Sequence, residues 1–328
     1  MIDHIDNICE ILTGKEKFLI TSHVNPEGDA IGSEMSLALA LRKIGKSVYV
    51  VNQDPIPYFL EFLPGVESVL YEDPGIDFDA GIILDCSTPG RTGRVSQVIA
   101  RCPRVICIDH HFTSGDYGEL HYCDADASST GELIFKVLKM MKIDIDPDIA
   151  TALWVAISTD TGSFRYSNVT GDSLSAAAEL VESGADPGWI SERLYEMEPR
   201  GRIALLSRAL STLEVVDGGK IAAITIYQKD LDDVGGRYDF LDGFINYPRS
   251  IRGVSVAVSF REEGNGTYKV SLRAKGDADV AAVASSFGGG GHIKAAGFSL
   301  RGRLKNVKKK VYERIIQSRT SQGDNNEA

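Results

Sequence analysis

The sequence predicts an α/β protein of two domains, in which a parallel sheet covered by helices is followed by a smaller α+β domain. Three observations support this fold class. The chain has 328 residues, 43% of them hydrophobic and 25% charged, which is enough for two cores. Over residues 1–160, short β-rich runs alternate with helical stretches, as they do in parallel sheets. After about residue 190 this alternation gives way to successive strands.

Short apolar runs predict the strands of the first sheet, near residues 17–22, 47–51, 80–85 and 104–109. Helices are predicted between and after them, over residues 30–44, 129–141, 148–160 and 172–183. Their ends carry the expected signals. Gly45 and Gly184 stop the first and last of these helices, and the capping-box pattern Ser129-x-x-Glu132 opens the second.

The second half of the chain predicts a connector and a separate sheet. The expected elements are a helical connector rich in Arg and Glu near 190–213, strands near 221–227, 253–262 and 267–274, a helix near 279–284 and a basic helix over 303–319. Gly264-Asn-Gly predicts a hairpin turn. We therefore predict a first domain at 1–190, a helical linker at 191–213, a second domain at 214–319 and a disordered tail at 320–328.

Composition limits the class of function. A net charge of −11 argues against a protein that coats long nucleic acid, because such binding needs many Lys and Arg contacts to phosphate. It leaves room for a small anionic ligand in a locally basic pocket. No apolar run approaches the length of a membrane span, and the five cysteines form no CxxC pair. Because the signal-peptide pattern is also absent, we expect a cytoplasmic protein without a membrane segment.

Acidic and imidazole residues gather where the predicted strands and one helix end. They are His23, Glu27, Asp29, Asp85, Asp109, His110, His111 and Asp160. Because open parallel sheets build their sites at the carboxyl ends of strands, we expect these side chains to converge. Carboxylates and imidazoles together suit Mn²⁺, and the set exceeds what one ion can use, which predicts a two-metal centre. Any one of them could instead be a structural cap; Asp29, for example, could cap the helix beginning at Ala30.

A glycine-rich run stands out in the second half of the chain, Gly288-Gly-Gly-Gly-His-Ile-Lys-Ala-Ala-Gly. Backbone amides without side chains can approach a phosphate or ribose closely, and His292 and Lys294 add donors. The alternative is a flexible turn between helix and strand. Four basic residues at predicted strand ends or turns, Arg249, Arg252, Arg273 and Lys275, either form a basic wall or are solvated surface charges.

Five elements in order make the chain similar to a known family. They are His23-Val-Asn-Pro-Glu-Gly-Asp-Ala-Ile-Gly-Ser, Asp85-Cys-Ser, Asp109-His-His, Asp160-Thr-Gly and the glycine-rich run from Gly288. Together they resemble the DHH phosphoesterase superfamily with its type 1 associated domain, over about residues 5–318. The length and the scarcity of insertions resemble the nanoRNase and 3′-phosphoadenosine 5′-phosphate (pAp) phosphatase group, and not the larger RecJ-like exonucleases. The resemblance implies a Rossmann-like catalytic domain and a substrate-binding domain.

The resemblance also implies roles for individual residues. One metal would be held by His23, Glu27 and Asp85, and the other by Asp29, Asp85, His110 and Asp160, with Asp85 as the bridge. Glu27 departs from the family pattern, which usually has Asp there, so we expect weaker or differently selective metal binding at that site. His111 would face the substrate as a catalytic residue beside Asp109.

Substrate contacts are implied in both domains. Residues expected to hold the terminal phosphate and nucleotide are Arg252, Arg273, Gly289, Gly290, Gly291 and His292, with Lys294 as a further donor. In the first domain, Arg165 would contact a phosphate. Its neighbours Phe164 and Tyr166 would either stack on a base or pack under the site.

The implied activity is the hydrolysis of short single-stranded RNA, about two to five nucleotides long and including linear dinucleotides, to mononucleotides. Such an exoribonuclease would also remove the 3′-phosphate of pAp, as a 3′(2′),5′-bisphosphate nucleotidase. Two Mn²⁺ ions are the expected cofactors, with Mg²⁺ as the alternative. The family habit leads us to expect a homodimer. Two other functions stay open, a family II-like inorganic pyrophosphatase and a nucleotide sensor that does not cleave.

Overall fold

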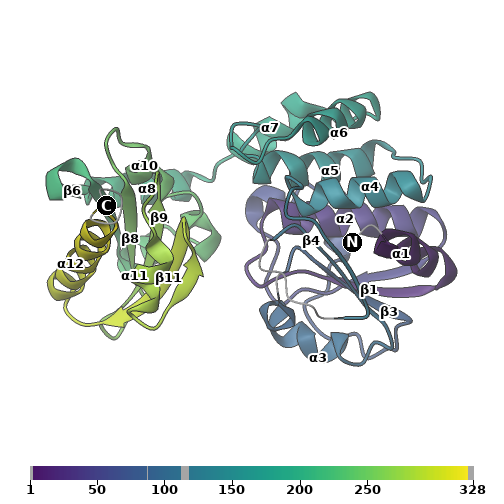
Figure 1. Cartoon of the computed structure of the whole chain (residues 1–328), viewed down its shortest axis with the longest axis horizontal. Coiled ribbons are helices and arrows are strands. Elements are labelled where there is room, and N and C mark those ends of the chain that lie inside the picture. The colour runs from purple at the N-terminus through teal and green to yellow at the C-terminus, as the bar shows by residue number, and fades with distance from the viewer. Residues whose placement is uncertain (1–2, 87, 112–117, 324–328) are drawn as a thin grey trace. The chain divides into compact units, whose positions relative to one another are not determined.

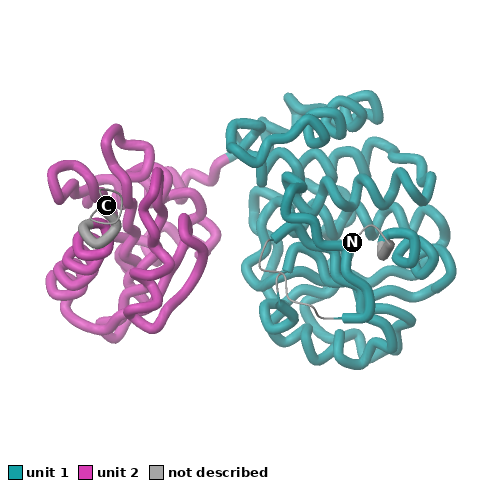
Figure 2. The backbone as a smooth tube through the Cα atoms, in the orientation of Figure 1, with its two compact units in different colours: residues 1–197 teal, residues 198–328 magenta. Residues whose placement is uncertain are grey.

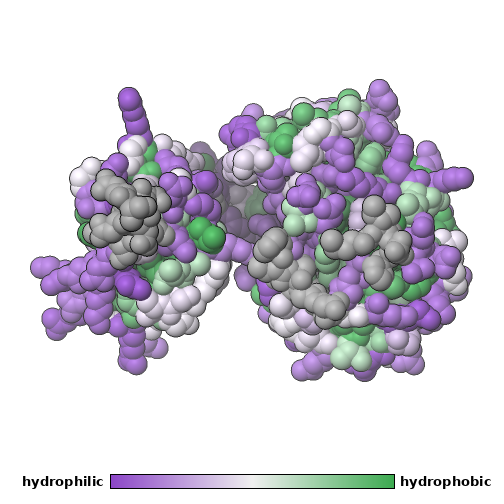
Figure 3. All heavy atoms as spheres, viewed as in Figure 1, coloured by the Kyte–Doolittle hydropathy of each residue, from purple (hydrophilic) through white to green (hydrophobic). Residues whose placement is uncertain are grey.

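The computed structural model describes residues 3–86, 88–111 and 118–323. The chain divides into two compact units, residues 1–197 and 198–328 (Figure 2). This division falls inside the predicted linker 191–213, so the residues of that linker belong partly to each unit. Hydrophilic residues cover most of the face shown in Figure 3. Among the described residues, every helix is too short or too polar to span a bilayer.

The first unit is built on a parallel five-stranded sheet in the order β2-β1-β3-β4-β5, which confirms the predicted α/β class. The strands are β1 (Lys17–Thr21), β2 (Ser47–Val50), β3 (Ala80–Leu84), β4 (Val105–Asp109) and β5 (Leu120–Cys123). The first four lie where the apolar runs predicted them. Strand β5 was not predicted, because its partly buried residues include His121 and lack the apolar run of a central strand.

Helices cover both faces of this sheet. They are α1 (Asp3–Gly14), α2 (Gly28–Lys43), α3 (Ser96–Ile99), α4 (Thr130–Met140), α5 (Pro147–Asp160), α6 (Gly171–Glu182) and α7 (Pro187–Tyr195). Helices α2, α4 and α5 lie on one side and α3 on the other (Figure 1). Because both faces are covered, all five residues of β3 are buried. The four predicted helices are confirmed to within two residues at each end, whereas α1 and α3 were missed.

Small residues let α2, α4 and α5 approach one another closely. A Cβ atom added to Gly32 in α2 would lie 2.5 Å from the carbonyl oxygen of Ala152 in α5. A Cβ atom added to Gly131 in α4 would lie 2.4 Å from the Cβ of Ala156. Both separations are shorter than van der Waals contact, so any larger residue would push the helices apart. This packing brings the first turn of α4 against the first turn of α2, where the candidate site lies.

The second unit holds a mixed six-stranded sheet in the order β10-β11-β9-β8-β7-β6. Its strands are β6 (Glu214–Val216), β7 (Ile221–Ile226), β8 (Val256–Glu262), β9 (Thr267–Ala274), β10 (Gly290–His292) and β11 (Ala295–Arg301). Its helices are α8 (Arg200–Ser211), α9 (Gln228–Asp233), α10 (Asn246–Ser250), α11 (Val280–Ser285) and α12 (Leu304–Gly323). Apolar residues of α11 and α12 pack on one face of the sheet as a separate core.

Most of the expected elements of this unit are present. The turn at 264–266 joins β8 to β9, and all three of its residues have positive φ. Strands β10 and β11 were not predicted, because the glycine-rich run carries no strand signal. Helix α12 continues to Gly323, so the predicted disordered tail begins too early; the rest of that tail, 324–328, lies outside the described residues.

Candidate metal centre

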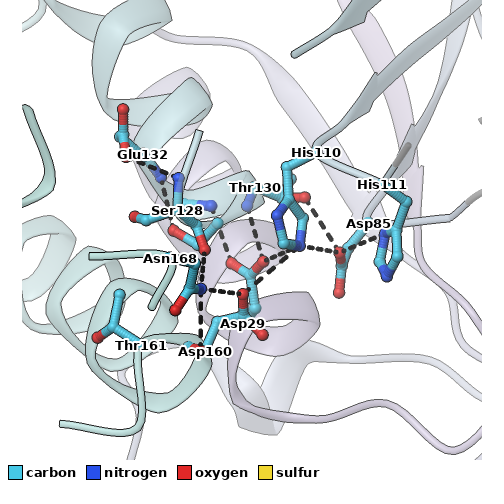
Figure 4. A network of polar contacts seen from close by, with 12 residues as sticks. Asp29, Asp85, His110, His111, Ser128, Thr130, Glu132, Asp160, Thr161 and Asn168 are labelled. Carbon is cyan, nitrogen blue, oxygen red and sulfur yellow. Dashed lines mark hydrogen bonds and ion pairs between the residues drawn. The ribbon is translucent and has the colours of Figure 1, made fainter. Parts of the chain in front are cut away.

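The carboxyl ends of three neighbouring strands place the predicted ligands at one edge of the first sheet. His23 follows β1, Asp85 follows β3, and His110 follows Asp109, the last residue of β4. The register of the sheet places the ends of β1, β3 and β4 at the same level. Thr21, the last residue of β1, pairs with Ile83 of β3, and Leu84, the last residue of β3, pairs with Ile108 of β4. Helices complete the set. Figure 4 shows that the side chains of Asp29 in α2 and Asp160 in α5 lie close to those of His110 and Asp85.

The ligand atoms form three overlapping groups, each within 4.8 Å. The groups are His23 with Glu27 and Asp85, Asp29 with His110 and Asp160, and Asp85 with His110 and His111. The structure therefore brings together all six residues predicted to bind metal. His111 is close enough to be counted with them. Asp85 belongs to two of the groups, the position expected of a bridge between two ions.

Asp85 is held in an unusual backbone conformation. Its φ is +52°, in the left-handed region that few non-glycine residues adopt, and its side chain is 1% exposed. Its Oδ1 lies 3.6 Å from His110 Nε2 and its Oδ2 lies 3.5 Å from His23 Nε2. Burial alone would raise the pKa of Asp85, but His23 and the charge of His111 hold it at about 2. The carboxylate is therefore ionised and available to cations.

The tautomer of His23 follows from its contacts. Its Nδ1 lies 2.8 Å from the backbone carbonyl oxygen of Val24. Because a carbonyl can only accept a hydrogen bond, Nδ1 carries the proton in the neutral ring. The lone pair is then on Nε2, the atom that faces Asp85. This is the arrangement by which a backbone acceptor commonly orients a metal-binding histidine.

His110 lies at the centre of the carboxylates. Its Nε2 is 3.6 Å from Asp85 Oδ1, 3.6 Å from Asp160 Oδ2 and 3.7 Å from Asp29 Oδ2 (Figure 4). None of these separations is a close hydrogen bond. Groups that converge at such distances leave room for a cation between them.

Asp29 connects two helices. Its Oδ2 accepts a hydrogen bond from the Thr130 amide at 2.7 Å and its Oδ1 from the Gly131 amide at 2.8 Å, so it caps the start of α4. The simple alternative, that Asp29 caps its own helix, is wrong, because α2 already begins at Gly28. Burial, together with the charges of Asp85 and Asp160, raises the pKa of Asp29 well above its ordinary value.

Asp160 is the last residue of α5, where the helix dipole disfavours a carboxylate. Burial raises the pKa of Asp160 to about 6, and the charges of Asp85 and Glu27 add to this. The Asn168 amide donates to Asp160 Oδ2 at 3.3 Å and holds it toward His110. An acid in such an unfavourable position indicates a functional constraint on the residue.

His111 is paired with Asp109. Its Nδ1 lies 2.7 Å from Asp109 Oδ1, and its backbone amide donates to the same oxygen at 3.2 Å. The Asp109 side chain is fully buried. This hydrogen bond raises the pKa of His111 to about 9, so the ring is protonated at neutral pH. Asp109 therefore orients His111 and not the neighbouring His110.

The donor set fits divalent cations. Several carboxylates crowd a buried volume, and Asp85 Oδ2 accepts no hydrogen bond from any described residue. Burying such charges is costly unless a cation compensates them. Oxygen and imidazole donors in this mixture suit Mn²⁺ or Mg²⁺. A bound divalent ion would supply Lewis acidity and lower the pKa of a water molecule.

Comparisons with known proteins agree with this geometry. Residues 17–157 match the DHH family, N-terminal domain, and residues 219–317 match the DHHA1 domain. A protein of Thermus thermophilus, named bifunctional oligoribonuclease and PAP phosphatase NrnA, is 35% identical over 95% of this chain and 92% of its own length. The chain belongs to the DHH family. A Bacillus subtilis protein of the same name is 26% identical over 87% of this chain and 90% of its own.

Two solved structures share the fold of this chain. An exopolyphosphatase-related protein from Bacteroides fragilis superposes with a TM-score of 0.91 at 28% identity, covering 97% of this chain and 96% of that one. RecJ from Thermus thermophilus, solved in complex with Mn²⁺, superposes with a TM-score of 0.54 at 13% identity, covering 95% of this chain and 54% of that one. The second likeness shows the fold alone.

Several residues at this DHH centre were missed by the sequence reasoning. The Thr130 hydroxyl donates to Asp85 Oδ1 at 3.1 Å. Glu34 in α2 is fully buried, and its Oε2 accepts from Asn52 Nδ2 at 2.7 Å. Burial raises the pKa of Glu34 to about 7. A glutamate on the apolar face of a predicted helix was the available signal for this residue.

Arg91 was also missed. Its side chain is half-buried, its carbonyl oxygen accepts a hydrogen bond from the Val24 amide at 2.7 Å, and its positive charge weakly opposes the raised pKa of His23 and of His111. A fixed cation therefore lies beside the metal centre within the first unit. It stands in a short 3-10 helix, Pro89–Val95, after β3, where periodicity gives no indication of which side chains turn inward.

The contacts of Phe164 bear on whether the aromatic residues after Asp160 stack on a base or pack under the site. Phe164 makes an edge-to-face contact with Trp154, 5.6 Å between ring centroids, and packs against the core. For this residue, packing under the site is the interpretation that the contacts support. Tyr166 is 49% exposed. Arg165 is exposed, and its Nε donates to the Gly162 carbonyl at 2.6 Å.

In the second unit, two features differ from expectation. The Lys294 ammonium donates to the carbonyl oxygens of Gly276 and Ala278, so it stabilises a turn instead of offering its charge freely. Within the glycine-rich run, residues 290–292 form strand β10, which pairs with β11, and the last three residues of the run belong to β11 itself. A Cβ atom on Gly289 would lie 2.2 Å from the Gly297 oxygen, and one on Gly291 would lie 2.5 Å from the Ala295 oxygen. These two glycines are needed for strand packing.

The remaining predicted residues of the second unit lie on or near the same sheet. A Cβ atom added to Gly290 would meet no other atom within 4 Å, and His292 at the end of β10 is exposed. Arg273 in β9 is paired in register with Ala295, and its guanidinium donates to the Leu272 carbonyl at 3.1 Å. Arg252 is exposed in the turn after α10. Arg273 and His292 thus come from strands that both border β11, which periodicity did not predict.

The metal-free protein is expected to lose stability as the pH rises from 5 to 7.5. Burial raises the pKa of Glu34 to about 7 and that of Asp160 to about 6, so the folded state keeps protons that the unfolded chain releases near pH 4. Because the folded state binds more protons in this window, the free energy of unfolding falls as the pH rises. The contribution of Glu34 is on the order of 3 kcal/mol. Urea denaturation of the chelated protein at pH 5 and at pH 7.5 measures this change in the free energy of unfolding.

Variants identify the source of this pH dependence. Glu34→Gln should flatten the change in unfolding free energy, whereas Glu182→Gln, at an exposed position of α6, should leave it unaltered. The lowered pKa of Asp85 acts only below about pH 4, outside the window. A wild-type unfolding free energy that rises between pH 5 and 7.5 would show that burial of these carboxyl groups does not govern stability.

Proposed function

We propose that this chain is a metal-dependent phosphoesterase that hydrolyses short RNA oligonucleotides to mononucleotides and removes the 3′-phosphate of pAp. The observation that carries this proposal is the sharing of Asp85 between two groups of potential ligands at the end of the parallel sheet. The names of the relatives from Thermus thermophilus and Bacillus subtilis support the substrate class. Substrates would be short single-stranded RNA, linear dinucleotides and small nucleotides.

We assign the ligands in two sets. One ion would be held by His23, Glu27 and Asp85, and a second by Asp29, Asp85, His110 and Asp160. Mn²⁺ is the preferred ion, because imidazoles accompany the carboxylates, and Mg²⁺ is the alternative. When bound, such ions supply Lewis acidity at the phosphate and an activated water.

The protein's own residues would position the substrate and move a proton. The contact with Asp109 keeps His111 protonated, so its ring can donate to an oxygen of the scissile phosphate or to the leaving group. Arg91 supplies a second cation close by. The second unit would bind the terminal phosphate and nucleotide through Arg252, Arg273 and His292.

A substrate panel tests the proposal. The purified protein with Mn²⁺ is given 5′-labelled RNA of two, five and about twenty-four nucleotides, with pAp and pyrophosphate in parallel. Rapid loss of the two short RNAs and of pAp, with the long RNA nearly untouched, is expected. Turnover of pyrophosphate alone would favour the pyrophosphatase alternative. Binding of dinucleotide without turnover would favour the sensor. Both results would overturn the proposal.

Glu27→Asp is expected to change metal affinity at one of the two ion positions. Glu27 is exposed at the start of α2 and belongs to the group with His23 and Asp85. Its extra methylene shifts the carboxylate by about one bond length, and metal–oxygen distances tolerate only about 0.2 Å. Isothermal titration with Mn²⁺ should show one altered step of roughly tenfold. Unchanged affinity and rate would contradict weaker or differently selective metal binding at this position.

Arg91→Ala is expected to lower kcat/KM on a dinucleotide by about 10²-fold, the scale of losing one fixed positive donor near a reacting phosphate. Arg91→Lys should recover part of this activity, because the charge is kept but the planar fork is lost. Arg101→Ala is the matched control, since Arg101 is exposed and paired with Asp73. Equal rates for the Arg91→Ala and Arg101→Ala variants would remove Arg91 from the site.

The compartment and the assembly are further parts of the proposal. None of the five cysteines forms a disulfide, which suits the reducing cytoplasm that we propose for this protein. A homodimer stays a prediction, and light scattering at several protein concentrations measures it.

A further inference from the structure

Three soft donors lie together on strands β4 and β5, outside the carboxylate centre. Cys107 of β4 is paired in register with His121 of β5, and Asp109 is paired with Cys123. Because side chains alternate along a strand, Cys107, His121 and Cys123 project from the same face of the sheet. One ligand atom from each of the three lies within 4.8 Å of the other two.

This spacing is close to that of a tetrahedral metal site. Zinc lies about 2.3 Å from thiolate sulfur and about 2.0–2.1 Å from imidazole nitrogen, so its ligand atoms are separated by roughly 3.5–3.8 Å. The three ligand atoms lie within 4.8 Å of one another, which is at most slightly farther apart than the ligands of a bound ion. Neighbouring parallel strands of a sheet also hold the three donors in fixed register.

The chemistry of these donors differs from that of the carboxylate centre. Two thiols and one imidazole are soft or borderline ligands that favour Zn²⁺ over Mn²⁺ or Mg²⁺, and three protein ligands leave a fourth position open. None of the three residues belongs to the groups formed by Asp29, Asp85 and Asp160. Selectivity for different ions at the two places therefore follows from ligand type.

The burial of the three residues suits a metal site that is partly shielded from solvent but accessible to an ion. Cys107 is fully buried, and His121 and Cys123 are half-buried. The Nε2 atom of His121 is itself buried. Buried cysteines more often serve as small apolar residues. What points to a metal site here is the shared register of the three residues and the short distances between their ligand atoms.

We propose that Cys107, His121 and Cys123 form a second metal site, which binds one Zn²⁺-class ion through two thiolates and one imidazole. On binding, each thiol releases its proton to solvent, and no oxidant is needed. This proposal is independent of the proposed phosphoesterase activity, because it uses none of the residues assigned to that reaction.

Cobalt spectroscopy distinguishes the two sites in the full-length protein. Reduced, chelated protein is titrated with Co²⁺ in the presence of saturating Mn²⁺. Thiolate-to-cobalt charge transfer absorbs in the near ultraviolet and requires sulfur, which the carboxylate centre lacks. We expect this band to saturate at one equivalent and to disappear when one equivalent of Zn²⁺ is added. Bound Zn²⁺ should also protect two of the five thiols from alkylation.

Variants locate the band. Cys123→Ser and His121→Ala should weaken Co²⁺ binding by more than about tenfold, the loss typical even of residues that only support a ligand. Cys102→Ser is the matched control, since Cys102 is also half-buried but lies outside the cluster. If Cys107→Ser fails to fold, the two half-buried positions still carry the test. No thiolate band in the folded wild-type protein, or a band that persists in both the Cys123→Ser and His121→Ala variants, would overturn the proposal.

Discussion

Asp85→Asn is expected to lower kcat/KM on an RNA dinucleotide by at least about 10³-fold, more than the loss of one electrostatic stabiliser in an active site. The substituted carboxylate is shared between the group of His23 and the group of His110. Its removal therefore weakens both ion positions and not only one. Calorimetric titration with Mn²⁺ should show that both binding steps are weakened.

Asparagine is the informative replacement at this position. Asp85 has a φ of +52°, and asparagine tolerates the left-handed region better than alanine does. The variant should therefore keep its fold, which circular dichroism of the chelated protein checks. Asp73→Asn, at a surface residue paired with Arg101, is the control for the loss of one carboxylate charge. Full activity of a folded Asp85→Asn variant would exclude the shared carboxylate as the basis of catalysis.

The ends of the strands explain why the ligands were predictable. Apolar runs revealed β1, β3 and β4, and the polar residues that follow such runs in a parallel sheet must meet at one edge. His23, Asp85 and His110 could thus be grouped without any knowledge of tertiary contacts. Asp160 stands at the end of a helix, and its grouping with them came from residue type and order alone.

The contacts between helices could not be predicted from the sequence. The capping of α4 by Asp29 depends on the close approach of α2 and α4, and both helices pack on α5 through a glycine, Gly32 and Gly131 respectively. Periodicity gives the apolar face of each helix but not the partner that covers it. For the same reason, the buried pair of Glu34 and Asn52 was missed, since its members are 18 positions apart on different elements.

The glycine-rich run was interpreted only in part. Glycines indicate that another group approaches the backbone closely, but the sequence cannot say whether that group is a ligand or a strand. At Gly289 and Gly291 the approaching atoms belong to β11. Open space beside Gly290, together with the exposed ring of His292, is what remains consistent with a ligand.

These contacts also suggest why the centre can be rigid before an ion binds. Asp29 is held by two amides of α4, Asp85 by the Thr130 hydroxyl and Asp160 by Asn168. Each supporting group is a neutral donor, so none cancels the charge of the carboxylate it orients. Ligands fixed in this way lose little conformational entropy on binding, which favours affinity.

His111→Gln is expected to lower kcat by about 10²–10³-fold while metal content stays unchanged, the range typical of losing a general acid. Asp109 holds the ring through Nδ1, so Nε2 is the atom that can face a substrate. Glutamine keeps a hydrogen-bond donor but cannot transfer a proton. Metal analysis of the purified variant separates this role from that of a ligand, because loss of an ion would show that His111 binds metal.

The pH profile gives a second and sharper test of His111. A general acid works only while protonated, so the rate should fall as the pH rises through the pKa of its ring, which Asp109 raises to about 9. Asp109→Asn removes the charge that stabilises the imidazolium, and the alkaline fall in kcat should then move to lower pH. His111→Gln should abolish that limb. Because a merely structural role would lower the rate equally at every pH, an unshifted limb in the Asp109→Asn variant would contradict proton donation by His111.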